Sequence, residues 1–102
     1  MSAAAPPRQR VDVWLWRARF AKTRAAAARM VSEGAVRLAR EGGSRRIEKP
    51  SVELAPGDAL TFRLGQELRT VRVEGLGLRR GPPAEARTLY SDLGYSDLGA
   101  QN

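Results

Sequence analysis

The segment Lys22-Thr23-Arg24 places two cations and a hydroxyl directly before an alanine-rich run. Thr23 is a favoured residue for capping the N-terminus of a helix, where free backbone N–H groups meet the positive end of the helix dipole. Cations, a hydroxyl and open amides in one place can bind a phosphate. An ordinary solvated helix cap with basic neighbours fits the same residues. The segment alone therefore leaves both interpretations open.

The charge distribution favours the phosphate-binding interpretation. Residues 8–49 hold twelve Lys or Arg against four acids, whereas residues 50–102 hold six against seven. Such an asymmetric charge favours an extended polyanion as partner, and nucleic acid is the common one for a small basic domain. Arg outnumbers Lys by sixteen to two, which suits bidentate phosphate contacts.

The residue types that are missing argue against most enzyme classes. The chain has no His and no Cys, which removes the usual general base, the thiolate nucleophile and the best transition-metal ligands. Its glycines do not form a phosphate-binding loop motif. Carboxylates can still act alone, but we expect no enzyme activity, no catalytic residue, no metal and no cofactor.

The sequence also gives expectations about location. It contains no apolar run near the about 18 residues that would span a bilayer. Its first residues have neither the basic start nor the apolar segment of a signal peptide. We expect a cytoplasmic protein that makes no membrane contact, and a monomer.

Periodicity predicts two short helices followed by strands. Helical spacing of apolar residues covers 12–19, and a second helix covers 24–33, with Thr23 as its cap and Gly34 at its left-handed end. Val36 and Leu38 then alternate as in a strand, and residues 40–44 are expected to form a loop. Ile47 is expected in irregular extended chain.

The second half predicts a hairpin and a short helix. Residues 55–58 (Ala-Pro-Gly-Asp) match a type II turn, and alternation over 60–64 and 68–73 predicts the hairpin. A last helix is expected over 84–90. The tandem repeat of Tyr-Ser-Asp-Leu-Gly over 90–99 is interpreted as duplication in a frayed tail, with a peptide recognised by a partner as the alternative.

The two tryptophans are expected to differ. Trp14 has the spacing of a core residue, whereas Trp16 lies on another side of the helix. Packing under the hairpin or tail, or stacking on an RNA base, would each explain Trp16.

Many ordered positions resemble the S-four-type (alpha-L) RNA-binding domain. They are Arg10, Val11, Asp12, Leu15, Thr23, Arg24, Ala27, Met30, Val31, Gly34, Val36, Ile47, Lys49, Pro50, Ser51, Leu54, Gly57, Asp58 and Leu60. Within that superfamily, three segments resemble the ribosome-associated fifteen-kilodalton heat-shock proteins: Trp14-Leu-Trp16, Ala18-Arg-Phe20 and Lys22-Thr-Arg24. The resemblance implies a non-catalytic stress protein that binds ribosomal RNA on large ribosomal subunits with a stalled nascent chain on transfer RNA.

This resemblance implies an α+β fold with two short helices on a small, mostly antiparallel sheet, a short C-terminal helix and a flexible tail. We expect a disordered N-terminal segment over residues 1–8, an RNA-binding domain with hairpin over 9–75, a C-terminal extension with a short helix over 76–93 and a flexible tail over 94–102. The expected RNA-binding residues are Arg10, Arg17, Lys22, Thr23, Arg24, Arg29, Arg37, Arg45, Arg46 and Lys49. Arg69 and Arg72 lie outside this basic segment and are expected to contribute little.

Two departures and two alternatives accompany this interpretation. The family usually has Asn-Gly after the strand, so the 38–43 segment here is expected to form a longer loop. The long basic C-terminal extension of some members is absent from the sequence. The alternatives are the RNA-targeting domain of a modifying enzyme, such as a pseudouridine synthase, and a DNA-binding module.

Overall fold

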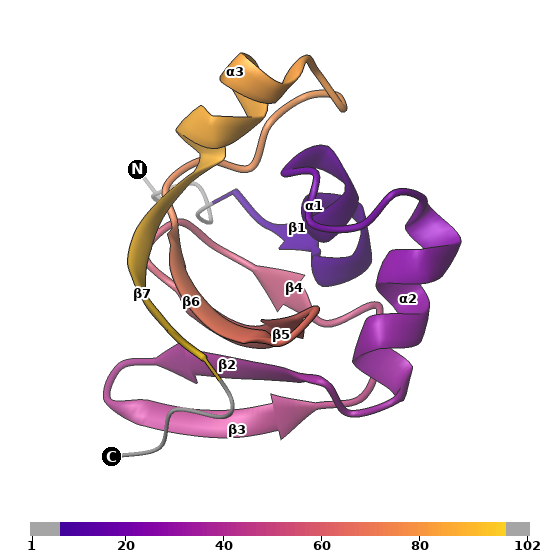
Figure 1. The fold of residues 1–102 in the computed structure, drawn as a ribbon. Helices are drawn as coiled ribbons and strands as arrows, with labels where there is room; N and C mark the ends of the chain where they lie inside the picture. Colours follow the sequence, from indigo (N-terminus) through magenta and orange to yellow (C-terminus); the bar gives the residue numbers. More distant parts are fainter. Residues whose placement is uncertain (1–6, 98–102) are drawn as a thin grey trace.

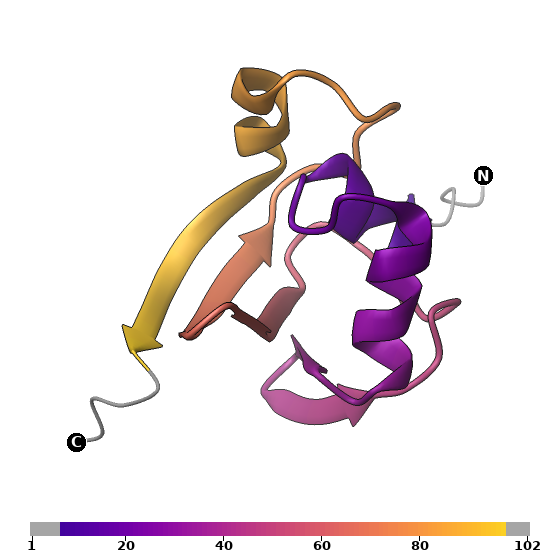
Figure 2. The same ribbon diagram turned by 45° about the vertical axis from the view of Figure 1, so that its right-hand side comes forward.

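The computed structural model describes residues 7–97, with two short helices packed on one side of an antiparallel sheet and a third at one end of it (Figures 1 and 2). The elements in chain order are β1 (Gln9–Arg10), α1 (Val11–Arg17), α2 (Arg24–Ser32), β2 (Val36–Arg40), β3 (Gly43–Ile47), β4 (Glu53–Leu54), β5 (Ala59–Leu64), β6 (Glu67–Val73), α3 (Pro83–Ala86), the 3-10 helix η1 (Arg87–Leu89) and β7 (Tyr90–Asp97). The expected fold class is confirmed. Residues 1–6 of the predicted N-terminal segment lie outside the described residues.

The second helix begins and ends where local sequence chemistry predicts. Thr23 has extended backbone angles, and its side-chain oxygen accepts a hydrogen bond from the Ala26 N–H at 2.9 Å. Gly34 follows the helix with a φ of +79°, in the left-handed region that closes helices. The helix residues Ala27 and Val31 are fully buried against the core, so this short helix is stabilised by its packing.

The main sheet has the strand order β3-β2-β5-β6-β7, and every neighbouring pair is antiparallel. A separate two-stranded ribbon pairs β1 with β4. The hairpin of β5 and β6 confirms the prediction over 60–73. Gly57 has a φ of +99° and the Asp58 N–H donates to the Ala55 carbonyl at 3.1 Å, as expected for the type II turn.

The predictions of a loop over residues 40–44 and of a longer loop over 38–43 are both wrong. Arg40 pairs with Gly43, so only Glu41 and Gly42 connect β2 to β3. Both connecting residues have positive φ, +53° and +83°, which is the type I′ geometry that joins twisted strands most tightly. Ile47, expected in irregular chain, ends β3 as a buried residue.

The core lies between the helices and the inner side of the sheet. Trp14 is fully buried, as predicted, and its indole N–H donates to the Gly75 carbonyl at 2.8 Å. The Phe20 ring packs against Phe62 at 4.8 Å and against Tyr90 at 4.6 Å between centroids. These contacts join the segment after α1 to the last strand of the sheet, residues far apart in the sequence.

The C-terminal part contains more strand than the sequence indicates. Residues 94–97, expected within a flexible tail, belong to β7 and pair with β6, with an irregularity between Thr70 and Val71. The expected helix over 84–90 is shorter, with four α-helical residues followed by η1. The rest of the predicted tail, residues 98–102, lies outside the described residues. The predicted domain boundaries stay predictions.

Candidate nucleic-acid interface

The start of α2, residues Lys22, Thr23 and Arg24, is called the helix-start site below. All three residues are exposed, and the first turn of α2 contains no acid. The Thr23 oxygen accepts the capping hydrogen bond, which leaves its hydroxyl hydrogen free to donate to a phosphate oxygen. The positive end of the helix dipole therefore has no acid in the first turn to offset it, and two exposed cations flank it.

Arg10 is exposed at the start of α1 but is already paired. Its guanidinium donates two hydrogen bonds of 3.0 Å to the two carboxylate oxygens of Asp12, whose side chain is 5% exposed. The hydrogen bond and charge of Asp12 raise the pKa of Arg10 above its ordinary value. The Asp12 carboxylate also accepts the Val13 N–H at 2.8 Å. Arg10 thus stabilises the start of α1, and part of the Arg10 side chain stays exposed to solvent.

Arg17, an expected RNA contact, lies in a different environment. Its side chain is half-buried, and Nη1 donates to the Gly77 carbonyl at 2.8 Å and to the Leu76 carbonyl at 3.4 Å. Its Nε atom is buried with no hydrogen-bond partner. This guanidinium joins α1 to the segment after β6, so its geometry is that of a structural residue.

Arg37 and Arg46 face the same side of the sheet. They lie directly opposite each other on β2 and β3, and both are exposed. The Arg46 side chain passes beside Gly34, where a Cβ atom would lie 3.2 Å from its Cδ, and its guanidinium is 3.6 Å from Glu48. The end of α2 therefore adjoins these two cations.

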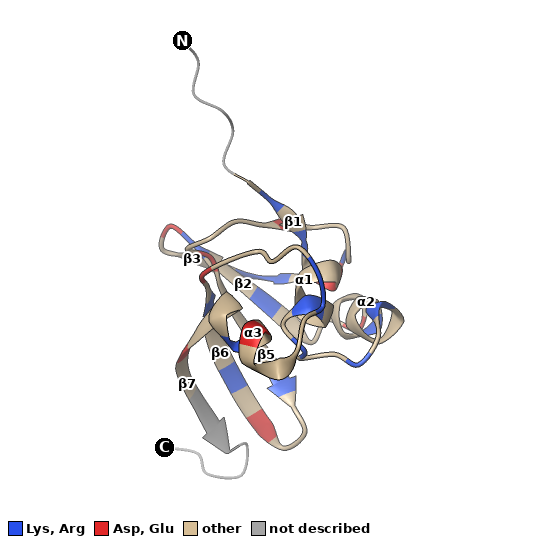
Figure 3. Ribbon diagram, turned by 90° about the horizontal axis from the view of Figure 1, so that it is seen from above, with Lys and Arg blue, Asp and Glu red and all other residues tan. Residues whose placement is uncertain are grey.

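The remaining expected residues are dispersed. Arg29 is exposed on α2 beyond its first turn, and Lys49 is exposed in the connection before β4. Arg45 pairs with the buried Leu38, so it points to the opposite side of the sheet from Arg46. Figure 3 shows Lys and Arg spread over α2 and several strands. The structure thus places the ten expected residues on more than one surface.

Arg40, in the basic segment but not an expected contact, has a structural partner. It donates two hydrogen bonds, of 2.9 and 2.7 Å, to Asp58, whose side chain is 6% exposed. Burial alone would raise the pKa of Asp58. The hydrogen bonds from Arg40 and the Ala55 N–H outweigh it and hold this pKa below its ordinary value. The pair fixes the turn before β5.

Sequence reasoning missed two outward cations on the hairpin. Arg63 on β5 and Arg72 on β6 are exposed, and the strand register places both on the side that carries Arg37. Arg69, grouped with Arg72 in the sequence analysis, instead points inward. It bonds Asp92 and lies over the Phe20 ring at 5.6 Å. Period-two alternation would have separated the two residues.

Trp16 is half-buried, and Arg80 covers its ring at 6.0 Å. The Arg80 Nε also donates to the Trp16 carbonyl at 3.1 Å. Trp16 is therefore packed within the fold, but against the segment before α3 and not under the hairpin or tail as expected.

Comparison with known proteins identifies the family of this chain. The S4 domain family model matches residues 9–60, which run from β1 into β5. The chain belongs to the S4 domain family.

Within residues 7–97, no group of three or more His, Cys, Asp or Glu lies together as a metal site would require. No helix in this described part is long and apolar enough to cross a membrane.

Individual relatives extend the similarity beyond the S4 domain. Heat shock protein 15 of Escherichia coli K12 is 41% identical over 87 residues, 85% of this chain and 62% of the relative. The Haemophilus influenzae homologue is 37% identical over 84 residues, 81% of this chain and 60% of its own length. The chain thus spans less than two thirds of these curated relatives.

A solved structure is also similar. Heat shock protein 15 of Vibrio cholerae, described as trimeric, gives a TM-score of 0.74 at 36% identity. The match covers 84% of this chain and 82% of that one. The similarity therefore covers more of the chain than the S4 domain match does.

Proposed function

We propose that this protein is a non-catalytic RNA-binding protein that holds structured ribosomal RNA through the helix-start site. The observation that carries the proposal is the capped, acid-free start of α2, with exposed Lys22 and Arg24 on either side of Thr23. Membership of the S4 domain family supports it. Arg29, Arg37 and Arg46 supply further exposed positive charge along α2 and at the adjoining strands.

The finer proposal is that the RNA belongs to the large ribosomal subunit carrying a stalled nascent chain on transfer RNA. Under this proposal the protein acts in the cytoplasm during ribosome recycling under stress. The similarity to the heat shock proteins 15 supports this role. A monomer is the state expected from the sequence, and the trimeric description of the V. cholerae relative makes sedimentation a useful check.

The surface of α2 disfavours base reading in a DNA major groove. Beyond Arg24 and Arg29 its outward residues are small, as at Ala25 and Ser32. Base-edge recognition needs several long polar side chains on one helix face. Phosphate contacts on a folded RNA need only the cations and the helix start.

Binding should therefore depend strongly on salt and favour structured RNA. With about five to seven phosphates neutralised, log K against log salt should slope by roughly −4 to −6. The measurement is a titration of a ribosomal RNA fragment and of a B-form DNA duplex at several salt concentrations. A slope near zero, or equal affinity for the two nucleic acids, would contradict the proposal.

The RNA element can be identified by crosslinking. Purified protein is crosslinked to RNA from lysed cells, and the crosslinked fragments are sequenced. We expect enrichment of large-subunit ribosomal RNA. Enrichment of unrelated messenger RNAs would leave RNA binding intact and overturn the ribosomal proposal.

A further inference from the structure

We propose that the outward side of the sheet is a second contact surface for RNA. This surface contacts the phosphate backbone of the same RNA molecule that binds at the helix-start site. This outer sheet face is formed by side chains that point away from the helices, and it includes Arg37, Arg46, Thr61, Arg63, Thr70 and Arg72. The exposed Leu68, opposite Arg63, lies on the same face. The proposal rests on the proposed function, because it assumes RNA binding. It adds the β5–β6 hairpin, most of which lies beyond the S4 domain match.

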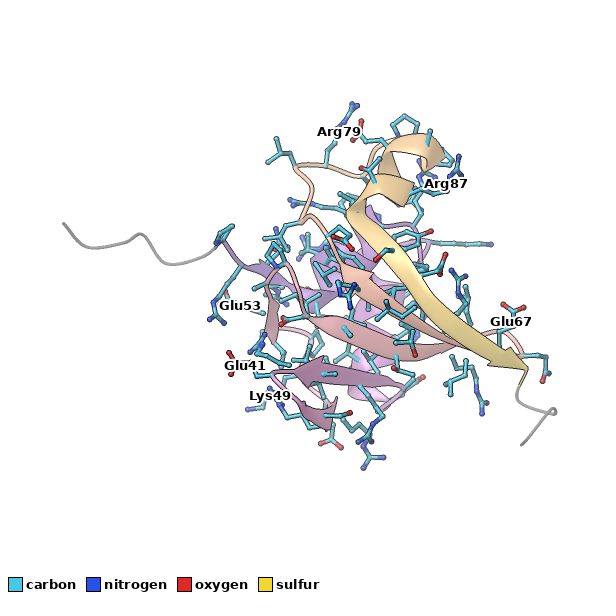
Figure 4. All side chains as sticks on the ribbon, turned by 90° about the vertical axis from the view of Figure 1, so that its left-hand side faces the viewer. Glu41, Lys49, Glu53, Glu67, Arg79 and Arg87 are labelled. Atoms are coloured by element: carbon cyan, nitrogen blue, oxygen red, sulfur yellow. The ribbon has the colours of Figure 1, made fainter. Side chains whose placement is uncertain are left out.

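The strand register defines this face. Val36, Leu38, Leu60 and Phe62 are buried against the helices, so the residues between them point the other way. Arg37 pairs with Thr61, and Thr61 bonds Thr70 of the next strand through their hydroxyls at 3.0 Å. Figure 4 views the sheet from this side, with the strands in front of the helices.

The strand and residue spacings of the sheet place the four arginines at intervals that match a short segment of RNA backbone. Neighbouring strands lie about 5 Å apart and alternate residues along one strand about 7 Å apart. Arg37 and Arg46 are thus separated by about one strand spacing, and Arg63 lies about 8 Å from Arg37 at the backbone. Arg72 is two strands and two residues away from Arg37, about 12 Å.

Three of the four cations on this face form no ion pair within the described residues, although Glu33 lines the hollow that contains Arg37, Arg46 and Arg63. The three are Arg37, Arg63 and Arg72, whereas Arg46 has the exposed Glu48 at 3.6 Å. Like charges directly opposite each other, as Arg37 and Arg46 are, destabilise a sheet. A polyanion laid across the strands would remove this repulsion. Charge complementarity therefore identifies the occupant of the face.

The chemistry of the face selects phosphates over bases. The face carries hydroxyls between the cations, and no described aromatic side chain points outward from these strands. Sheets that read single-stranded RNA stack bases on outward aromatic residues. We infer that the outer sheet face contacts the backbone of a base-paired segment and contributes affinity with little sequence preference.

The face adjoins the end of α2. A surface hollow lined by Glu33, Gly34, Arg37, Arg46, Thr61 and Arg63 joins the two elements. The helix-start site lies at the opposite end of α2, whose nine residues extend about 14 Å. RNA that bends around α2 can therefore reach both surfaces.

The test removes the two hairpin cations that only this proposal uses. Arg63→Gln with Arg72→Gln should weaken binding to a base-paired ribosomal RNA hairpin by about 5- to 30-fold, as expected for two solvent-exposed phosphate contacts. The slope of log K against log salt should become shallower by about 1 to 2. Arg79→Gln with Arg87→Gln removes the same charge near α3, where Figure 4 labels both residues, and should change affinity less than twofold.

A conservative variant distinguishes charge from structure. Arg63→Lys with Arg72→Lys keeps both cations and should restore most of the lost affinity, because a phosphate accepts Lys as well as Arg. Thermal melting of each variant checks that the sheet is intact. Failure of the Lys variant to bind better than the Gln variant would overturn the phosphate-contact proposal.

The outcomes separate this proposal from the proposed function. Equal affinities of the hairpin variant and its α3 control, with a loss in Lys22→Gln plus Arg24→Gln, would overturn the outer sheet face and leave the proposed function standing. Absence of RNA binding by the wild-type protein would overturn both. Unchanged RNA affinity with an altered sedimentation coefficient in the hairpin variant would make the face a contact between copies of the chain instead.

Discussion

Two basic regions of this molecule use their cations for different purposes. Where α1 meets residues 75–81, Arg17 donates to the Gly77 carbonyl at 2.8 Å and Arg19 to the Gly81 carbonyl at 2.7 Å. In the opposite direction, Arg80 of this segment donates to the Trp16 carbonyl of α1 at 3.1 Å. At the start of α2, by contrast, Lys22 and Arg24 are exposed and form no ion pair within the described residues.

The difference teaches that net charge is a poor guide to a binding surface. A guanidinium that donates to backbone carbonyls keeps its charge but has fewer donors and less freedom for a phosphate. Backbone carbonyls carry no formal charge, so these arginines keep their full positive charge and still add to the field that attracts RNA. We expect the α1 contact to affect stability and the start of α2 to affect affinity.

The largest stability effect is expected at the α1 contact. Arg17→Gln with Arg80→Gln removes four hydrogen bonds to carbonyls and the cation over the Trp16 ring. The free energy of unfolding should fall by about 2–4 kcal/mol. Denaturant unfolding measures it, and a loss below about 0.5 kcal/mol, the usual range for a surface change, would show that the contact is not structural.

A pH-dependent effect is expected at the turn before β5. Asp58→Asn removes the charge that Arg40 pairs with and should lower stability by about 1–3 kcal/mol at pH 7. Because the folded protein holds the pKa of Asp58 low, its contribution is present above the unfolded pKa of about 3.9 and is lost as pH falls through the folded value.

The wild-type and Asp58→Asn proteins should therefore converge in stability under acid conditions. Denaturant unfolding at neutral pH and at several values below about pH 4 measures the difference. A difference that stays constant into acid would mean that the side chain acts through packing and not through its charge.

A smaller effect is expected where α2 meets the sheet. Gly34→Ala places a Cβ 3.2 Å from the Arg46 Cδ and forces a non-glycine residue to a φ of +79°. The cost should be about 1 kcal/mol. Gly42→Ala is a matched control, because Gly42 also has positive φ but nothing within 4 Å of the added Cβ. Equal losses in the two variants would assign the whole effect to the backbone and none to Arg46.

The sequence predicted the features that depend on neighbouring residues. The Thr23 cap, the left-handed Gly34 and the turn at Gly57 follow from local chemistry within a few positions. The buried side of α2 follows from helical periodicity for the same reason. The position of the helix-start site could therefore be predicted without knowing how the sheet is arranged.

Features that depend on distant residues could not be predicted in this way. The carbonyl partners of Arg17 lie 59 and 60 residues along the chain. The pairing of residues 94–97 with β6 depends on strand register, which only the folded sheet establishes. The two-residue turn at Glu41 was missed because it requires positive φ in a residue that rarely adopts it.

The most direct measurement compares two variants that remove the same formal charge from different places. Lys22→Gln with Arg24→Gln changes the helix-start site, and Arg79→Gln with Arg87→Gln changes exposed residues beside α3. Both are titrated against one ribosomal RNA fragment at fixed salt. The first should lose about 2–4 kcal/mol of binding free energy, roughly 30- to 1,000-fold in affinity, with stability changed by no more than about 0.5 kcal/mol. The second should bind nearly as the wild type does. Equal losses would contradict a local site and show that net charge alone drives binding.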